Sequence, residues 1–232
     1  MRKFMKKQLL TFFLTFTAVF YFITNTKPTN AELLPYLKSI EVVIKKELGQ
    51  LSSDEKILQK KFKDYNVAAK ILNEFFDVSL CKQQISKMGK LMFGLFCYKV
   101  RPIDSFVFRL KTDSYDNNNV VSNFFVFFPF DDSKEDENIF SDLCAELNIN
   151  VGPDKQMNIF TPEDEAFIFD LMQTLVEKHF HHSDTRSIKE KMACCFGSED
   201  GWMLSFIIGQ IKVLTVLQQD INNKINEIEA TS

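Results

Sequence analysis

The residues best suited to chemistry lie in one stretch, where three histidines precede an aspartate and two adjacent cysteines. His179 and His182 are three residues apart, so a helix would bring both imidazoles to one face. Together with Asp184 they could bind a metal ion, and Cys194 could complete a zinc-like set. The spacing matches no known metal motif, and a helix C-terminus also favours histidines because its dipole attracts positive charge. We therefore favour an exposed helix end over a metal site.

Other patterns that would indicate catalysis or cofactor binding are missing from the sequence. A cysteine near a histidine permits a thiol nucleophile, but no glycine-rich oxyanion loop or strand–turn–helix elbow surrounds any cysteine. The chain has seven glycines and no phosphate-binding glycine motif. The acidic run 131–137 lacks the spaced ligands of a calcium loop, which favours a solvated loop. We expect no catalytic residue and no cofactor.

The N-terminus has the three parts of a secretory signal peptide. Basic residues open the chain, an apolar run follows from Leu9 to Ile23, and a small residue, Ala31, suits a cleavage site before Glu32. The run has about 15 residues, fewer than the roughly 20 that a membrane-spanning helix needs. Residues 1–31 are therefore predicted to be a cleaved signal peptide of an exported protein, with an uncleaved anchor as the alternative.

The remaining residues, 32–232, are predicted to form a single domain, because a chain of this length can bury a sizeable core. The first 31 residues hold five of the 28 basic side chains and no acid, so the predicted mature chain has 23 basic and 31 acidic residues, a net charge of −8. The basic surface of a nucleic-acid-binding protein is therefore not expected. After cleavage no stable membrane insertion is expected either.

All five cysteines follow the predicted signal peptide: Cys81, Cys97, Cys144, Cys194 and Cys195. An oxidising compartment favours pairing, and an odd number leaves at least one thiol unpaired or bonded to another chain. Neighbouring cysteines form a disulfide only with strain. We therefore predict a Cys81–Cys97 disulfide and a bond from Cys144 to Cys194 or Cys195, with five buried thiols as the alternative.

The elements expected to position these residues are helices, then strands, then helices. Apolar spacing predicts helices over 32–49, with a stop at Gly49, and over 52–80. The runs 91–100, 105–111 and 120–130 are rich in β-forming residues and are predicted as three strands of an antiparallel meander. Helices follow over 137–148, 162–181, 187–196 and 199–229. The Thr161–Pro162 pair marks the start of the helix over 162–181. The predicted fold class is α+β with one long final helix.

The final helix has a narrow apolar stripe in its second half, formed by Ile221, Ile225 and Ile228. A stripe at this spacing is typical of a helix–helix seam. Packing against the N-terminal helix of the same chain is favoured over self-association.

These patterns favour an exported, non-enzymatic protein-interaction protein, periplasmic or extracellular, with an unknown protein partner. A secreted effector of a host-associated bacterium is one form of this reading. A small periplasmic metal- or thiol-dependent enzyme using the His179, His182 and Cys194 region is one alternative. An envelope assembly or chaperone-like factor is another.

Overall fold

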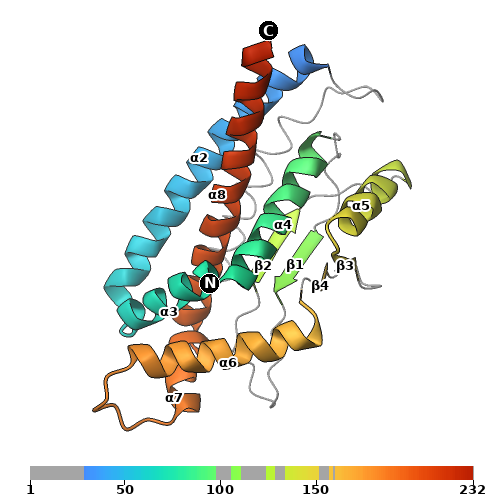
Figure 1. Cartoon of the computed structure of the whole chain (residues 1–232). Helices are drawn as coiled ribbons and strands as arrows, with labels where there is room; N and C mark the ends of the chain where they lie inside the picture. Colours follow the sequence, from blue (N-terminus) through green and yellow to red (C-terminus); the bar gives the residue numbers. More distant parts are fainter. Residues whose placement is uncertain are drawn as a thin grey trace.

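A computed structural model describes residues 29–97, 106–110, 124–128, 134–151, 157–158 and 160–231. Two long helices, α2 (Asn30–Lys61) and α8 (Glu199–Thr231), run antiparallel beside each other (Figure 1). Ion pairs join them near both ends, Lys38 to Glu229 and Lys61 to Asp200, each at 2.6 Å. The other helical segments are α3 (Tyr65–Asp77), α4 (Ser79–Cys97), α5 (Lys134–Glu146), α6 (Pro162–His179), α7 (Ile188–Met192) and the π-helical turn Ala193–Gly197.

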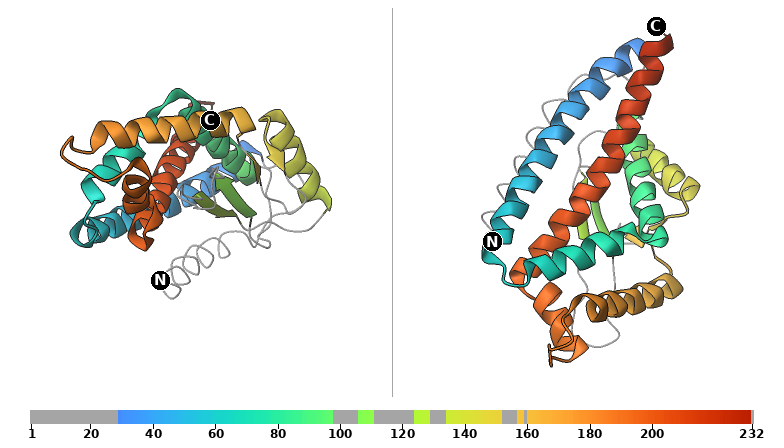
Figure 2. Two further views of the ribbon diagram at one scale, coloured as in Figure 1. Left: turned by 90° about the horizontal axis from the view of Figure 1, so that it is seen from below. Right: turned by 60° about the vertical axis from the view of Figure 1, so that its left-hand side comes forward.

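The contact between α2 and α8 follows from a seven-residue repeat on each helix. The buried positions of this repeat are Leu37, Ile44, Leu51 and Leu58 on α2, and Ile207, Leu214, Ile221 and Ile228 on α8. Side chains at this spacing stay on one face along the whole helix, which is the geometry of paired helices. Helices α4 and α3 pack on other faces of α8, so α8 lies at the centre of the core (Figure 2).

Helix α2 continues through Gly49, where the sequence predicted a stop. Nothing lies within 4 Å of a Cβ built at Gly49, and the residue is exposed. Glycine in a helix interior costs roughly 1 kcal/mol relative to alanine. The burial of Ile44 and Leu51 on either side, in the same face against α8, outweighs that cost.

The apolar run at 91–100 was predicted as a strand, and this prediction is wrong. Its first seven residues belong to α4, and Leu91 and Met92 are 0% and 1% exposed. Residues 98–100 lie outside the described part of the chain. A short, fully apolar run fits a buried helix as well as a strand, because neither shows a polar face. Upstream, Cys81, Ile85 and Met88 share a buried helical face with Met92, and this continuity extends the helix.

The strands that the structure describes are short and form a mixed sheet rather than a meander. Strands β1 (Phe106–Leu110) and β2 (Phe124–Phe128) pair antiparallel, as the sequence predicted for these two segments. Two-residue strands follow, β3 (Asn150–Val151) and β4 (Met157–Asn158), and β4 pairs with β1 in parallel. The strand order is β2-β1-β4-β3, and β2 contacts α8.

The predicted fold class, α+β with a three-stranded antiparallel meander, is therefore wrong. The described residues are mainly helical, one of the three predicted strands is helix, and the strand pairing is confined to a few residues. The predicted signal peptide, 1–31, lies outside the described residues except for 29–31, so it stays a prediction.

The predicted starts of the last three helices are confirmed to within one residue, whereas their ends differ from the predicted ones by a few residues. Thr161 and Asp164 form a capping box at the start of α6, with the Asp164 amide donating to Thr161 Oγ1 at 3.2 Å. Ser187 and Glu190 cap α7 in the same way. Each box satisfies amide groups that a helix start leaves without helical partners.

Helix α8 is long and apolar enough, by length and composition, to cross a membrane, and it is the one such helix among the described residues. Half of its most apolar window is buried against other parts of the chain. Its burial by α2, α3 and α4 accounts for this apolar composition.

Glu47, on α2, makes the stability of the helical body depend on pH. Burial raises the pKa of this carboxyl above its usual value, Lys46 opposes the shift, and Asp54 adds to it. A carboxyl whose pKa is raised by folding stabilises the fold when protonated and destabilises it as the pH rises through its folded pKa. Glu47→Gln should therefore raise the stability at pH 7 by less than about 1 kcal/mol, because partial exposure limits the cost.

This gain in stability should vanish below the ordinary glutamate pKa. There the protonated carboxyl of Glu47 in the wild type is as neutral as the glutamine amide in the variant. Thermal melting of wild type and Glu47→Gln between pH 4 and 8 measures the difference. Glu177→Gln, at an exposed position of α6, is the matched control. A gain for Glu47→Gln that is equally large at pH 4 would contradict the burial argument.

Candidate functional site

The three metal-ligand candidates do not converge in the structure. His179, at the end of α6, lies with Nε2 2.6 Å from Glu74 Oε2 on α3. The Lys178 ammonium contacts the other oxygen of Glu74, and the hydrogen bonds from Lys178 and His179 lower the pKa of the Glu74 carboxyl. His182 is exposed. Within the described ranges, no three His, Cys, Asp or Glu side chains are close enough to share a metal ion.

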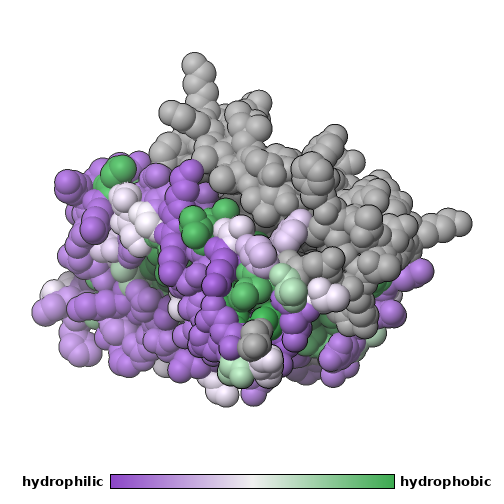
Figure 3. Space-filling model, turned by 90° about the horizontal axis from the view of Figure 1, so that it is seen from above, coloured by the Kyte–Doolittle hydropathy of each residue, from purple (hydrophilic) through white to green (hydrophobic). Residues whose placement is uncertain are grey.

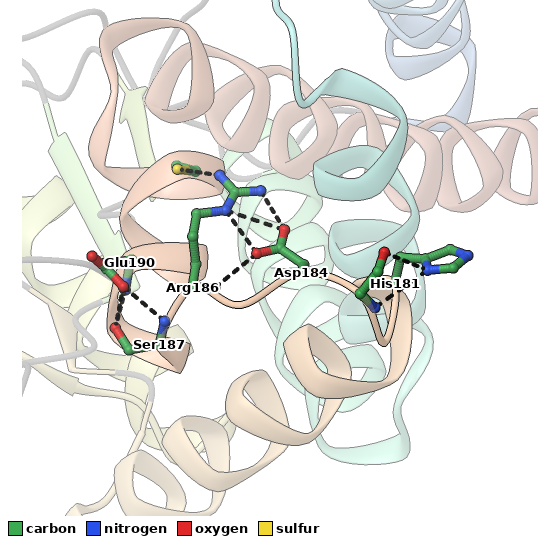
Figure 4. Close-up of polar contacts among 7 residues, drawn as sticks. His181, Asp184, Arg186, Ser187 and Glu190 are labelled. Carbon is green, nitrogen blue, oxygen red and sulfur yellow. Dashed lines mark hydrogen bonds and ion pairs between the residues drawn. The ribbon is translucent and has the colours of Figure 1, made fainter.

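Asp184 belongs to a separate cluster that closes the loop between α6 and α7 (Figure 4). The Arg186 guanidinium donates to both Asp184 oxygens, with Nη2 2.6 Å from Oδ2, and the Arg186 amide also donates to Oδ1. These hydrogen bonds lower the pKa of Asp184 to about 2. The guanidinium also contacts Cys194 Sγ at 2.8 Å and lies 5.3 Å from the Phe180 ring centroid.

This cluster holds the loop against the π-helical turn that carries both adjacent cysteines. Arg186 is the residue that joins Asp184 to Cys194. The link is a cation between them rather than a shared metal ion. His179 is thus engaged with Glu74 of α3, and Asp184 is ion-paired with Arg186 within its own loop.

The predicted Cys81–Cys97 disulfide is wrong. Both residues belong to α4, sixteen positions apart, which separates them by roughly 24 Å along the helix axis. A disulfide requires Cα atoms within about 7 Å. Cys81 is a buried thiol that forms no disulfide, and the same holds for Cys144, the other predicted half of a bond. Cys194 and Cys195 form no disulfide either.

The four described thiols should differ sharply in reactivity. Burial raises the pKa of Cys81, Cys144 and Cys195 to about 12, whereas Cys194 is only partly buried. Because the thiolate is the reactive form, we expect iodoacetamide to label Cys194 first among these four thiols in the native protein. Peptide mapping after timed alkylation measures this order, and Cys194→Ser should remove the fast component. Fast labelling of Cys81 or Cys144 in the folded protein would contradict the structure.

Sequence reasoning missed a pocket where the end of α2 meets the start of α8. Its volume is about 280 Å³, and roughly two turns of each helix supply its walls. The lining residues are Asp54, Ile57, Leu58 and Lys61 from α2, and Glu199, Asp200, Met203 and Ile207 from α8. Spacings of three and four residues place each set on one helix face.

The pocket joins a buried apolar interior to a charged rim. Leu58 and Ile207 are 3% and 2% exposed, whereas Ile57 at the rim is 56% exposed. Lys61 is paired with Asp200 at 2.6 Å, and Asp54, 4% exposed, accepts a hydrogen bond from the Gln50 amide at 3.2 Å. Such a combination can hold a ligand that is itself partly apolar and partly charged.

Each lining residue has a local reason to be where it is, which is why no sequence pattern marked the pocket. Acidic side chains suit the first turn of α8, and Lys61 suits the last turn of α2, because each complements the helix dipole. Leu58 and Ile207 belong to the seven-residue repeat. The one available signal was Ile57, an apolar residue that falls outside that repeat and is exposed.

The predicted interaction stripe of the final helix is buried within the chain. Ile221, Ile225 and Ile228 are 0%, 7% and 1% exposed, and α8 packs against α2 along its length. This is the internal packing that the sequence favoured over self-association. Seen from above, the described surface is mostly hydrophilic with small, separate hydrophobic areas (Figure 3).

No protein-family model, no curated protein and no solved structure matches this chain. The geometry of the pocket and of the polar clusters therefore carries the functional argument. Of these, the pocket alone combines an accessible opening with a lining suited to a ligand.

Proposed function

We propose that the chain is an exported, non-enzymatic protein-interaction protein, and that the pocket between α2 and α8 contacts its partner. The observation that supports this is the exposed Ile57 beside a hollow lined by buried apolar side chains. Exposed apolar side chains at a concave surface with a charged rim are typical of protein contacts. The pocket volume, about 280 Å³, lies below the roughly 300–1,000 Å³ of small-molecule sites.

The roles of the polar side chains support the non-enzymatic part of the proposal. A general acid or base must be available to a substrate. His179 is engaged with Glu74, Asp184 with Arg186, and the capping carboxylates of Asp164 and Glu190 with backbone amides. These groups stabilise the fold.

Export is tested by the N-terminus of the mature protein. Cleavage after Ala31 should leave Glu32 as the first residue, since the basic start, the apolar run and the small residue at −1 align there. Mass spectrometry of the protein from the exported fraction checks this. A product that retains Met1 in the membrane fraction would contradict export as a soluble domain.

The interaction itself is tested by photo-crosslinking from the rim of the pocket. A photoreactive amino acid at position 57 should give one discrete adduct with a second polypeptide in cells that produce the protein. The same substitution at Phe167, 47% exposed on α6, is the matched control and should not give that adduct. The adduct should also disappear in the variant Met203→Glu, which places a carboxylate in the pocket. Equal crosslinking from both positions, or none from position 57, would overturn the proposal.

A thiol-dependent enzyme is the second candidate, and the position of Cys194 favours it. The thiol is partly exposed on a π-helical turn and contacts the Arg186 guanidinium, a setting found around reactive cysteines. An activity that is lost in Cys194→Ser, with unchanged folding and unchanged crosslinking from position 57, would support this candidate.

A further inference from the structure

The α2–α8 pocket has an apolar projection beside an apolar hollow. Ile57 is 56% exposed at the rim, whereas Leu58, Met203 and Ile207 are buried in the lining. A group that reaches these three side chains must be apolar to avoid an unpaired polar contact. Met203 is flexible and can adapt to different shapes. An isoleucine side chain has the chemistry that the hollow accepts, and the same surface presents one.

The charged side chains at the rim are complementary to one another. Lys60 follows Ile57 by three residues on α2, a spacing that puts both on the same side of the helix. Glu199 lines the opposite wall, at the start of α8. Lys60 and Glu199 are exposed, and neither has an ion pair with another described residue, whereas Lys61 and Asp200 already pair at 2.6 Å. The rim thus carries a base beside the projection and an acid beside the hollow.

We infer that two copies of the chain associate about a two-fold axis, with Ile57 of each protomer inserted into the α2–α8 pocket of the other. This inference rests on the proposed function and identifies the partner as a second copy. A two-fold axis uses one patch on both protomers, so the patch must be complementary to itself. Here the projection of one protomer meets the hollow of the other, and Lys60 meets Glu199. The pocket, of about 280 Å³, has room for one isoleucine side chain.

The overall charge of the chain sets the conditions for this association. Residues 32–232 carry a net charge of −8, so two copies repel each other at low ionic strength. At physiological ionic strength the screening length is about 8 Å, which weakens repulsion between distant charges. The opposite charges that meet at the rim are closer than this. The association is therefore expected at physiological rather than low salt.

Sedimentation equilibrium of the exported protein at physiological ionic strength measures the association. The mass should rise from one chain to two over roughly 10 μM to 1 mM, the range expected of a small interface. Ile57→Asp should weaken the dimer at least about a hundredfold, because it brings a carboxylate to each apolar hollow. Val42→Asp, at a position of α2 that is 65% exposed, is the matched control and should dimerise like the wild type.

Charge reversal tests which side chains meet across the axis. Lys60→Glu and Glu199→Lys should each weaken self-association about tenfold, because each variant places like charges together twice. The double variant restores both opposite pairs and should dimerise within about threefold of the wild type. An equimolar mixture of the two single variants should form the heterodimer for the same reason. Both positions are exposed, so the variants should melt like the wild type.

The outcomes separate this inference from the proposed function. A single-chain mass at every concentration, an equal loss in Val42→Asp and Ile57→Asp, or a double variant as weak as the single variants would overturn the dimer. The crosslink from position 57 should have twice the mass of the chain. An adduct of any other mass would leave the interaction function standing with a different partner. If no adduct formed, both would fall.

Discussion

Replacing Gly201 by alanine should lower the free energy of unfolding by about 3 kcal/mol. A Cβ at this position would lie 2.0 Å from the Cys195 carbonyl oxygen and 2.7 Å from its carbon. These are backbone atoms of the π-helical turn, so no side-chain rotation can relieve the contact. The start of α8 and the turn would have to separate, which would also disturb buried Cys195 and Phe196.

Gly49→Ala is the matched control because it makes the same chemical change where there is room. Nothing lies within 4 Å of the added methyl group, and alanine favours helix over glycine. This variant should gain about 0.5–1 kcal/mol. Urea unfolding of both variants gives the two differences. A Gly201→Ala protein within about 0.5 kcal/mol of the wild type would show that the turn does not pack as described.

Changing Ile225 to aspartate should cost about 3–5 kcal/mol, because it places an unpaired charge in the seam between α2 and α8. Ile225 is 7% exposed, and its neighbours on the stripe, Ile221 and Ile228, are almost fully buried. Thermal melting and urea unfolding measure the loss. Because the stripe is internal, light scattering should show the same mass for wild type and variant where both are folded.

Val42→Asp is the control for this experiment. Val42 lies on the same helix pair but is 65% exposed, so its replacement should change the stability by less than about 0.5 kcal/mol. An Ile225→Asp protein with wild-type stability and a smaller assembly would reverse the conclusion. It would show that the stripe contacts a second molecule rather than α2.

Two glycines inside helices of this chain, Gly49 and Gly89, have opposite effects on helix packing and stability. Gly49 lies in open space and weakens α2, whereas Gly89 lets α4 approach α8, since a Cβ there would meet Val216 Cγ1 at 2.6 Å. Both lie inside helices, where glycine is less favourable than alanine by its intrinsic propensity. Only the distance to a neighbouring helix decides whether a methyl group would stabilise or destabilise the protein.

The sequence by itself determined those features that depend on local geometry and periodicity. The capping box of Thr161 and Asp164 is an example, because its hydrogen bonds join residues three apart. The extent of α8 and the internal burial of Ile221, Ile225 and Ile228 are others, because a repeated apolar stripe can be recognised in the sequence without knowing its partner. The pairing of the segments around Phe108 and Val126 also followed from local pattern.

Tertiary structure decided everything that depends on which surfaces meet. The run starting at Leu91 is helix because Met88 and Met92 continue one buried face, and that helix keeps Cys81 and Cys97 too far apart to bond. Arg186, which no pattern marked, joins Asp184 to Cys194. The pocket arises only when α2 and α8, more than a hundred residues apart in sequence, are brought together. Contacts between distant segments leave no local periodicity, so they follow from packing alone.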